Sequence, residues 1–381
     1  MDAHAAAMRI ACVGGGPGGL TLAALAAGRA HDVTLFEQRA SGTYGLGVVL
    51  WPDHLSDLAL LDPLLVHRLL QHAVAWRDQH ISTPGSPAVV LEGRGHGIAR
   101  ATMLSLLEQR AVELGARVER GTAIEHPDVL GSFDAVILAD GAASALRSMR
   151  AHDFGSRTRE EGNRYAWLEL DRPSDRFAFP FITAGDGWAW AHAYPFRAGA
   201  TTFIVETTES AWIAEGFDHM PTDDAVRRLE ALFADHLRGG SLRPARGTAP
   251  DALWSRFRLV ENRRWSSGRT ALLGDAAHTT HFSIGSGTRL AMEDAATLVE
   301  LLDHAPSAEE ALRTYDTRRR DELRGIQRSA RLSARFLGRL PRYIDRPAED
   351  FAHLLERRRS RLLPLIPTGI YLGLTRPRSG R

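Results

Sequence analysis

The sequence contains no lysine, so all 47 of its Lys and Arg positions are arginines. An arginine guanidinium stays protonated and can hold a phosphate or carboxylate through two parallel hydrogen bonds, but it cannot form a Schiff base. The absence of lysine therefore excludes a Walker-type phosphate site and every mechanism that depends on a lysine nucleophile.

Cysteine is nearly absent as well, because Cys12 is the single thiol in 381 residues. One thiol excludes intrachain disulfides and cysteine-cluster metal sites, and it fits a reducing compartment. No apolar run reaches transmembrane length, and the Ala-rich start lacks the core and cleavage pattern of a signal peptide. We therefore expect a cytoplasmic location without stable membrane association.

An excess of charge of one sign is also missing, since 47 basic and 46 acidic side chains leave a net charge of +1. This balance gives no sign of nucleic-acid binding. With 44% hydrophobic and 24% charged residues, the composition is that of a globular protein. The length predicts two domains.

The stretch from Thr270 to Asp294 carries most of the functional interpretation. Residues 271–273 predict a short buried strand that ends at Asp275, where a carboxylate can accept hydrogen bonds from a polyol such as a ribityl chain. Residues 288–303 have helical periodicity, so residues 285–288 would present backbone N–H groups at a helix N-terminus. Such a terminus would stabilise an anionic flavin ring. A plain strand–loop–helix joint explains the pattern equally well.

A glycine motif near the N-terminus predicts a dinucleotide site. Gly14 would make the tight turn after a first strand, Gly16 would let a pyrophosphate approach the backbone, and Gly19 would let the next helix lie close to that strand. Residues 33–37 predict the second strand, and Glu37 at its end would bind an adenosine ribose hydroxyl. The motif does not distinguish FAD from NAD(P).

Two further segments carry candidate ligand-binding residues. Arg100 opens a predicted helix to residue 114, where its charge opposes the helix dipole, so it has either an anionic or polar partner or only solvent. Residues 133–139 predict a buried strand that ends at Asp140, at the edge where open α/β sheets bind ligands. Arg147, in the following helical turn, could reach a phosphate.

Four segments in the middle of the chain alternate apolar and polar residues and carry many aromatic side chains: 165–170, 176–182, 188–194 and 201–206. They predict an antiparallel sheet, with further strands at 76–81 and 88–92. One aromatic face could hold a flat organic substrate, although core packing is the simpler role for any single tryptophan. Residues 44–51 predict an apolar loop that lies against a flat ring or packs in the core, and residues 93–97 predict a loop between domains.

Helical patterns cover residues 53–72, 222–237 and 306–340. In the last of these the arginines alternate with acids, which indicates a solvated face. The sequence indicates no conformation for residues 357–381.

The three nucleotide motifs, in their order along the chain, resemble the three fingerprints of class A flavoprotein monooxygenases, the family of para-hydroxybenzoate hydroxylase. These motifs are the glycine motif with Glu37, the segment 140–147 and the segment 274–278. The resemblance implies an α/β fold with a Rossmann-like FAD-binding domain, an inserted antiparallel β-sheet substrate domain and a C-terminal helical region. It also implies one non-covalent FAD, with NADH or NADPH as co-substrate. The residues assigned to FAD in this way are Gly14, Gly16, Gly19, Glu37, Arg39, Arg100, Asp140, Asp275, Gly285, Gly287 and Thr288.

The same resemblance divides the chain into three parts. Residues 1–70, 98–155 and 263–305 would form the FAD-binding domain, and residues 71–97 and 156–262 the substrate-binding sheet. Residues 306–381 would form the C-terminal helical region and tail.

Four stretches are similar to a narrower group, the flavin domain of 2-aminobenzoyl-CoA monooxygenase and salicylyl-CoA 5-hydroxylase: 163–167, 191–194, 203–206 and 281–294. The hydroxylases of indolic substrates in violacein biosynthesis are similar over the same stretches. The chain lacks the reductase domain that is fused to 2-aminobenzoyl-CoA monooxygenase, so a fused dearomatising reduction is not expected.

The resemblance implies an aromatic hydroxylase that uses NAD(P)H and O2 and transfers oxygen from a C4a-hydroperoxyflavin. Its substrate would be a benzoyl thioester of CoA or a carrier protein, with an ortho hydroxyl or amino group, hydroxylated para to that donor. An indolic or free aromatic acid substrate stays open. So do a flavin oxidase and a non-catalytic binder of this fold, although the intact segment 285–288 speaks against the binder. The missing lysine excludes a lysine-dependent flavin halogenase.

The candidate catalytic residues are His192 and Tyr194 on the sheet, and His281 and Phe282 beside the flavin loop. His281 could polarise or deprotonate a ring substituent near neutral pH, or it could make a structural hydrogen bond. We expect no metal at His278 and His281, because a third ligand is not evident.

Overall fold

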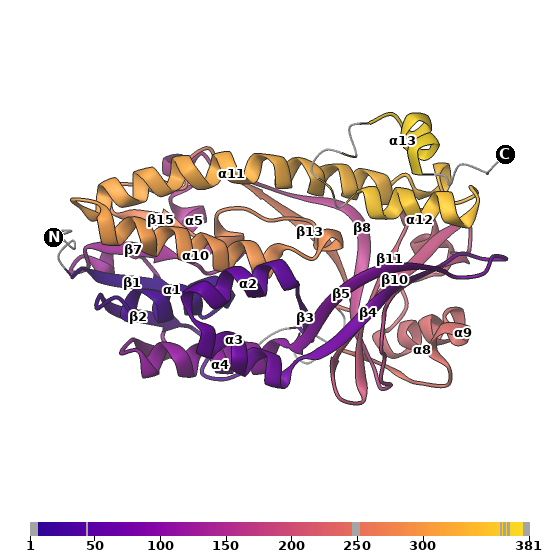
Figure 1. Cartoon of the computed structure of the whole chain (residues 1–381), viewed down its shortest axis with the longest axis horizontal. Helices are drawn as coiled ribbons and strands as arrows, with labels where there is room; N and C mark the ends of the chain where they lie inside the picture. Colours follow the sequence, from indigo (N-terminus) through magenta and orange to yellow (C-terminus); the bar gives the residue numbers. More distant parts are fainter. Residues whose placement is uncertain are drawn as a thin grey trace.

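The computed structural model describes residues 7–42, 45–245, 252–358, 360, 363 and 366–375. These residues form two β-sheets that follow one another along the long axis of the molecule (Figure 1). Strand β8 (Arg157–Leu170) and helix α11 (Ala308–Leu337) each extend from the first half of the molecule into the second. They therefore tie the two halves together.

The first sheet is mostly parallel and has the strand order β14-β15-β7-β1-β2-β6. The strand bounds are β1 (Arg9–Val13), β2 (Asp32–Glu37), β6 (Arg117–Arg120), β7 (Ala135–Leu138), β14 (Ser266–Ser267) and β15 (Thr270–Leu272). β1 runs parallel to β2 and β7, and β7 runs parallel to β15. Strands covered on both faces consist of apolar runs, which is why the sequence predicted β2, β7 and β15 correctly to within one or two residues and placed a strand before Gly14, where β1 lies.

The glycine motif joins β1 to helix α1 (Pro17–Ala27). Gly14 has φ +115°, and a Cβ there would overlap the carbonyl of Ala139 at the end of β7. A Cβ at Gly19 would overlap the carbonyl of Gly14, so α1 can lie against β1 only because this residue is glycine. The tight turn and the close helix packing predicted from these two glycines are both present.

The second sheet has the strand order β12-β8-β11-β10-β9-β4-β5-β3, and β13 pairs with β8. The bounds of its other strands are β3 (Gly47–Leu50), β4 (Val74–Ser82), β5 (Val89–Ala99), β9 (Phe177–Ala184), β10 (Gly187–Arg197), β11 (Ala200–Thr207), β12 (Leu242–Pro244) and β13 (Trp254–Glu261). Its pairings are antiparallel except for β4 with β9, which are parallel. The six strands predicted for this sheet are confirmed.

Two segments that were predicted as loops are strands of this sheet. Residues 93–97 lie inside β5, and residues 47–50 form β3, which pairs with β5; residue 44 lies outside the described part of the chain. The glycines have a packing role here, because a Cβ at Gly97 would overlap the Pro195 carbonyl and one at Gly95 would overlap the Trp76 ring. Glycine in these strands marks a close approach across the sheet rather than a turn.

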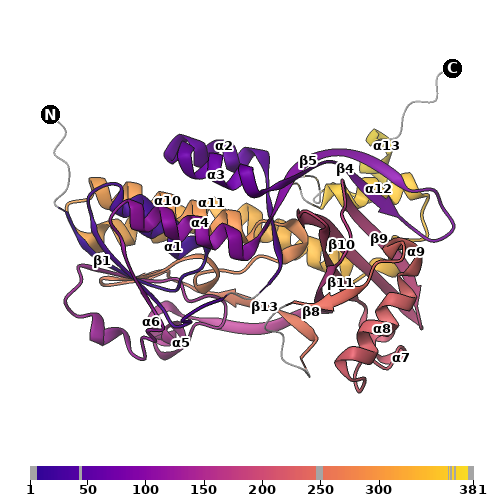
Figure 2. The ribbon, with the colours of Figure 1, turned by 90° about the horizontal axis from the view of Figure 1, so that it is seen from below.

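The helices cover the first sheet on both sides: α1, α4, α10 and α11 lie on one side and α5 and α6 on the other (Figure 2). The remaining helix bounds are α2 (Pro52–Leu61), α3 (Pro63–His72), α4 (Arg100–Glu113), α5 (Ala145–Met149), α6 (Ala151–Phe154), α7 (Glu209–Ala214), α8 (Thr222–Leu232), α9 (Ala234–Leu237), α10 (Gly287–His304), α12 (Ala348–Arg357) and α13 (Thr368–Thr375). Short 3-10 turns are η1 (Pro127–Leu130), η2 (Gly274–Ala276), η3 (Phe282–Ile284) and η4 (Leu340–Arg342).

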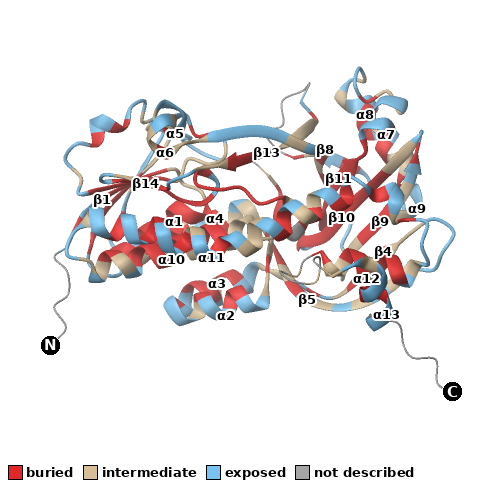
Figure 3. Ribbon diagram, turned by 90° about the horizontal axis from the view of Figure 1, so that it is seen from above, coloured by how far each residue is buried: buried red, intermediate tan, exposed pale blue. Residues whose placement is uncertain are grey.

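The helical pattern predicted over residues 53–72 is two helices, because Asp62 ends α2 and caps α3 by accepting the Leu65 N–H at 3.0 Å. The pattern over 222–237 is likewise divided, at Phe233. Helices α10 and α11 bury one face and expose the other, as predicted for the charged segment (Figure 3). In the part of the chain that the structure describes, no helix is both long and apolar enough to cross a membrane.

The carboxylate of Asp294 on α10 connects the turn after β15 with helices α10 and α11. It is fully buried and accepts the Gly274 N–H at 3.1 Å, lies 2.8 Å from His278 Nε2, and accepts Arg319 Nε of α11 at 2.9 Å. Burial alone would raise the pKa of Asp294, but His278 and Arg319 outweigh it and lower the pKa below its ordinary value. The carboxylate is therefore ionised and paired.

We predict that Asp294→Ala destabilises the FAD-loaded protein by roughly 3–5 kcal/mol at pH 7, because it removes the buried carboxylate that the Gly274 N–H, His278 and Arg319 share. Arg319 would keep Glu293 and Glu322 as acid partners, but both are more exposed than Asp294. Urea unfolding of both proteins at the same FAD concentration measures this difference. The control is Asp321→Ala on α11. The Asp321 side chain is 58% exposed, so this change should alter stability by no more than about 0.5 kcal/mol. Because the pKa of Asp294 is lowered in the folded protein, the stability that its carboxylate contributes is fully present at pH values above the ordinary aspartate pKa of 3.8. This stability is lost as the pH falls through the folded pKa. Equal stability of the two variants at pH 7 would contradict this role.

Candidate active site

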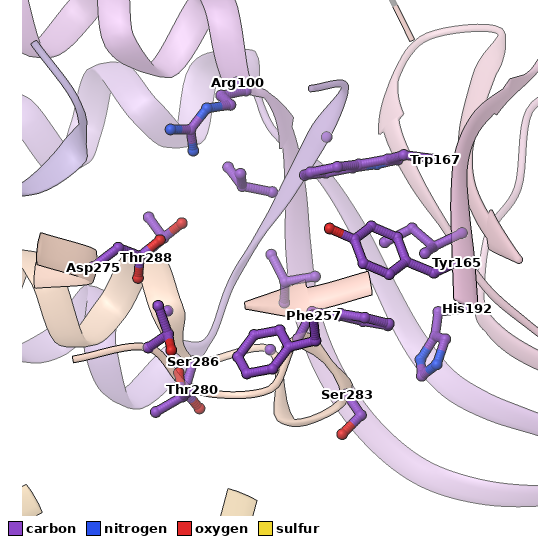
Figure 4. Close-up of a pocket in the computed structure, with 18 of the residues that line it drawn as sticks. Arg100, Tyr165, Trp167, His192, Phe257, Asp275, Thr280, Ser283, Ser286 and Thr288 are labelled. Carbon is purple, nitrogen blue, oxygen red and sulfur yellow. The ribbon is translucent and has the colours of Figure 1, made fainter. Parts of the chain in front are cut away.

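A cavity of about 560 Å³ lies where the two sheets meet, and both halves of the molecule contribute to its wall (Figure 4). The first half supplies Arg39, Arg100, Asp275 and the segment 285–288. The second half supplies a largely aromatic wall that includes Tyr165, Trp167, Phe177, Phe179 and Phe257, and Phe282 of η3 joins it. The cavity is therefore polar on one side and aromatic on the other, as expected for a site that orients a flat organic molecule.

Asp275 and Arg100 lie on the polar side, facing the aromatic wall across the cavity (Figure 4). The Asp275 carboxyl opens to the cavity but protein surrounds it, so burial raises its pKa, while His278 and Arg100 act in the opposite direction. Burial likewise lowers the pKa of Arg100, and Asp275 raises it. The pair can offer a hydrogen-bond acceptor and a cation to one ligand in a site sheltered from bulk water.

The segment 285–288 forms the start of α10 and lines the same cavity. Gly285 has φ +61°, and its carbonyl accepts a hydrogen bond of 3.0 Å from Trp51 Nε1. No side chain caps α10, so its first backbone N–H groups have no side-chain acceptor of the usual kind. The structure thus provides the helix N-terminus at the cavity that the sequence predicted.

The glycines of the first motif, Glu37 and Asp140 surround the β1–α1 turn and do not line the cavity, whereas Ala142 and Ala143 of the second motif do. Gly16 has open space where a Cβ would stand, and Glu37 braces the turn by accepting the Gly15 N–H at 2.7 Å and the Arg39 N–H at 2.8 Å. Asp140 lies beside this turn, and its buried Oδ1 atom has no hydrogen-bond partner. Burial raises the pKa of Asp140. An open glycine turn with an unsatisfied polar atom fits the close approach of a dinucleotide.

The prediction that Arg147 reaches a phosphate is wrong. Its side chain is buried, and its guanidinium donates to the carbonyls of Ala276 at 3.1 Å and Ala142 at 2.9 Å. Arg147 therefore fastens the turn after β7 to the turn after β15 instead of meeting a ligand.

Three of the four catalytic candidates line the cavity: His192, Tyr194 and Phe282. Tyr194 donates a hydrogen bond of 2.9 Å to the Gly47 carbonyl, and burial raises its pKa, so it stays a neutral phenol. Phe282 packs against Tyr165 at a tilt of 55°, with ring centroids 4.8 Å apart.

The fourth candidate, His281, stands behind Phe282 and lines a separate cavity of about 30 Å³. Its Nδ1 atom lies 2.8 Å from Ser283 Oγ, and burial lowers its pKa to about 4. His281 is therefore neutral near pH 7 and makes the structural hydrogen bond that the sequence left open. His278 is hydrogen-bonded to the Asp294 carboxylate, and no cluster of potential metal ligands occurs among the described residues.

Sequence reasoning missed Phe257 in the cavity wall and the carboxylate of Glu206 behind it. Phe257 lies on β13, whose alternating residues 254–260 carried a strand signal. Glu206 lay inside a correctly predicted strand, but no local pattern distinguishes a buried glutamate from an exposed one.

Comparison with known proteins agrees with this geometry. The FAD binding domain family matches residues 91–330, and an NAD(P)-binding Rossmann-like domain matches residues 12–43. The chain is 39% identical over 349 residues to the 3-hydroxy-4-methyl-anthranilyl-[aryl-carrier protein] 5-monooxygenase of Streptosporangium sibiricum, covering 91% of this chain and 93% of that protein. It is 36% identical over 365 residues to the salicyloyl-CoA 5-hydroxylase of a Streptomyces species, covering 92% of this chain and 70% of that protein.

Solved structures show the same fold at low identity. A crystal structure of a mutant of 2-methyl-3-hydroxypyridine-5-carboxylic acid oxygenase superposes with a TM-score of 0.70 at 19% identity, over 92% of this chain and 98% of that one. PqsL of P. aeruginosa in complex with 2-aminobenzoylacetate gives a TM-score of 0.68 at 18% identity, over 88% and 98%. Because the family match spans more than half of the chain, the protein belongs to the FAD-binding-domain family of FAD-dependent, NAD(P)H-using monooxygenases.

Proposed function

We propose that this monooxygenase hydroxylates the ring of an ortho-hydroxy- or ortho-amino-benzoyl thioester, para to the ring donor, and that it acts in the cytoplasm. The cavity carries this proposal, because it sets an aromatic wall directly opposite Asp275 and the start of α10. The two relatives described above are named for an anthranilyl group on an aryl-carrier protein and for salicyloyl-CoA, which share an aromatic ring bearing such a donor.

The residues around the polar side fit FAD. Gly14, Gly16, Gly19, Glu37 and Asp140 would hold its adenosine and pyrophosphate, where the open turn admits a phosphate and Glu37 can meet a ribose. Asp275, Arg39 and Arg100 would meet the ribityl and phosphate region, and Gly285, Gly287 and Thr288 the flavin ring. Bound FAD supplies the activation of O2, and the protein's part is to orient the ring and exclude water.

The para position follows from the electronics of the substrate. An electrophilic oxygen attacks a ring where electron density is highest, and a hydroxyl or amino donor raises it at the para carbon. The thioester carbonyl withdraws density, so its part would be in binding.

A second hollow, of about 600 Å³, offers space for the arm that a thioester substrate would carry. It shares Trp51, Gln79 and Ser286 with the main cavity, and it is also lined by Arg94 and by Ile326 of α11. A pantetheine arm is long and mostly uncharged, and this hollow would give it a way from the ring to the surface.

We predict that the purified protein is yellow with non-covalent FAD and that Asp275→Ala weakens FAD binding. A charge-assisted hydrogen bond is worth roughly 1.5–3 kcal/mol, so the Kd should rise about 10- to 100-fold. Flavin fluorescence titration of the apoprotein measures it. Asp186→Ala, at an exposed turn of the second sheet, should bind FAD like the wild type. A folded wild-type protein that cannot be reconstituted with FAD would contradict the assignment.

For the substrate, we predict NADPH- or NADH-dependent hydroxylation of the N-acetylcysteamine and CoA thioesters of salicylate and 2-aminobenzoate, with little turnover of the free acids. Product formation by mass spectrometry and substrate-stimulated NAD(P)H oxidation are the measurements. Turnover of the free acids or of tryptophan-derived indoles, but not of the thioesters, would disprove the thioester assignment while leaving the hydroxylase in place.

The route for the arm is tested by filling the second hollow. Ile326→Trp should raise the KM for a CoA thioester several-fold and leave the KM for the short N-acetylcysteamine thioester unchanged, because only the longer arm would need this space. Ile326→Val keeps the hollow open and should behave like the wild type. An equal change for both thioesters would show that the arm leaves by another way.

A further inference from the structure

A buried carboxylate stands directly behind a histidine of the aromatic cavity wall. Glu206 of β11 is 1% exposed, and its Oε2 atom lies 3.5 Å from Nε2 of His192 on the neighbouring strand β10. This is an electrostatic contact longer than an ordinary hydrogen bond, and no other hydrogen-bond partner of these two buried atoms occurs among the described residues. Its Oε1 atom accepts a hydrogen bond of 2.9 Å from Asn163 Nδ2 of β8. Three adjacent strands therefore fix the carboxylate on the protein side of the histidine.

His192 itself lines the cavity and is held in place by two aromatic rings. Its ring makes edge contacts with Phe179 and Phe282 at centroid distances of 5.2 and 5.6 Å. Because Nε2 faces Glu206, Nδ1 is the ring nitrogen left for a ligand in the cavity, and no protein partner for it occurs among the described residues.

The polar groups around Glu206 keep its carboxylate ionised. Burial would raise the pKa of Glu206, but His192, His281 and Asn163 outweigh it and the net shift is downward. Two titratable or charged groups face the pair from other elements. His281 is neutral near pH 7, and Arg358 donates to the Ser283 carbonyl at 2.7 Å and to Ser333 Oγ at 2.9 Å. Burial lowers the pKa of His192, and Glu206 acts against this shift.

A buried carboxylate costs several kcal/mol in desolvation and is weak support for stability alone. A carboxylate behind a histidine has a known physical effect: it holds the N–H of the near nitrogen toward itself, which leaves the far nitrogen as an acceptor, and it stabilises the imidazolium that forms when that nitrogen takes a proton. The arrangement suits a histidine that must accept a proton from the cavity.

We propose that Glu206 is a positioning residue that orients His192, and that His192 Nδ1 is the catalytic base for the ring donor of the substrate. For a hydroxyl donor, the O–H bond breaks, its proton moves to Nδ1 and the electron pair stays on the phenolate oxygen, which enriches the para carbon. For an amino donor, Nδ1 accepts a hydrogen bond from the N–H without removing the proton. The assignment rests on the proposed function only in requiring a substrate with a hydroxyl or amino group on its ring.

The test is the pH dependence of kcat/KM for Glu206→Gln, measured with whichever phenolic probe the wild-type holoenzyme turns over, either the N-acetylcysteamine thioester of salicylate or free salicylate. His192 must be neutral to accept a proton, so activity falls as the pH drops through its pKa. Loss of the negative charge lowers that pKa, so the acidic limb should move to lower pH while the plateau falls by about 100-fold or more. A merely structural role for Glu206 would lower the plateau without moving the limb.

Glu169→Gln is the matched control, because Glu169 is paired with Arg197 on the same sheet and does not line the cavity. Its pH profile should superpose on that of the wild type. FAD content and the rate of flavin reduction by NAD(P)H report whether each variant is folded.

If Glu206→Gln does not fold, His192→Asn tests whether residue 192 takes a proton. An amide can accept a hydrogen bond at the Nδ1 position but cannot take a proton. Its profile should lose the acidic limb. An unchanged limb in either variant overturns the proposal. The two proposals fail in different ways. If the wild type turns over only free salicylate, the thioester assignment is wrong. If the acidic limb of the pH profile does not change in the variants, the assignment of His192 as the base is wrong.

Discussion

The ionised carboxylate of Asp294 is the interaction on which the arrangement of the polar side depends. It joins the end of β15, the loop at His278, helix α10 and helix α11 in one buried network. The same network determines where Asp275 stands relative to the start of α10. Asp275 directly follows Gly274, and the start of α10 belongs to the same helix as Asp294. A buried charge requires partners at defined positions, so the joint has little freedom to relax.

The cavity exists because two sheets of different construction meet there. The parallel sheet ends in turns that expose backbone N–H groups and carboxylates, and the mostly antiparallel sheet presents the side chains of one face. Neither half alone would hold both a polar cofactor and a flat ring.

His192 and His281 show how position decides the chemistry of similar side chains. Both are buried and both have a lowered pKa. His192 lines the main cavity and has a carboxylate behind it, whereas His281 is turned away behind Phe282 and binds Ser283. Only the first has a ring nitrogen left for a ligand of the main cavity.

Much of the fold was determined by local sequence patterns. The buried strands β1, β2, β7 and β15 are apolar runs, the glycine turn needs Gly14 and Gly19 for steric reasons, and the long helices carry a 3.6-residue periodicity. These signals act between neighbours in the chain, so they can be read without the fold. They also located most of the residues on the polar side of the cavity.

Tertiary structure alone decided which glycines are turns and which polar groups are functional. Gly95 and Gly97 belong to a strand because β5 pairs with β3 and β4, and the Trp76 ring and the Pro195 carbonyl leave no room there for a side chain. Arg147 binds backbone carbonyls, and Glu206 is buried behind His192, because strands far apart in the sequence place their partners there. The sequence determined the elements and the chemistry available to them, whereas contacts between distant segments decided where that chemistry faces a ligand.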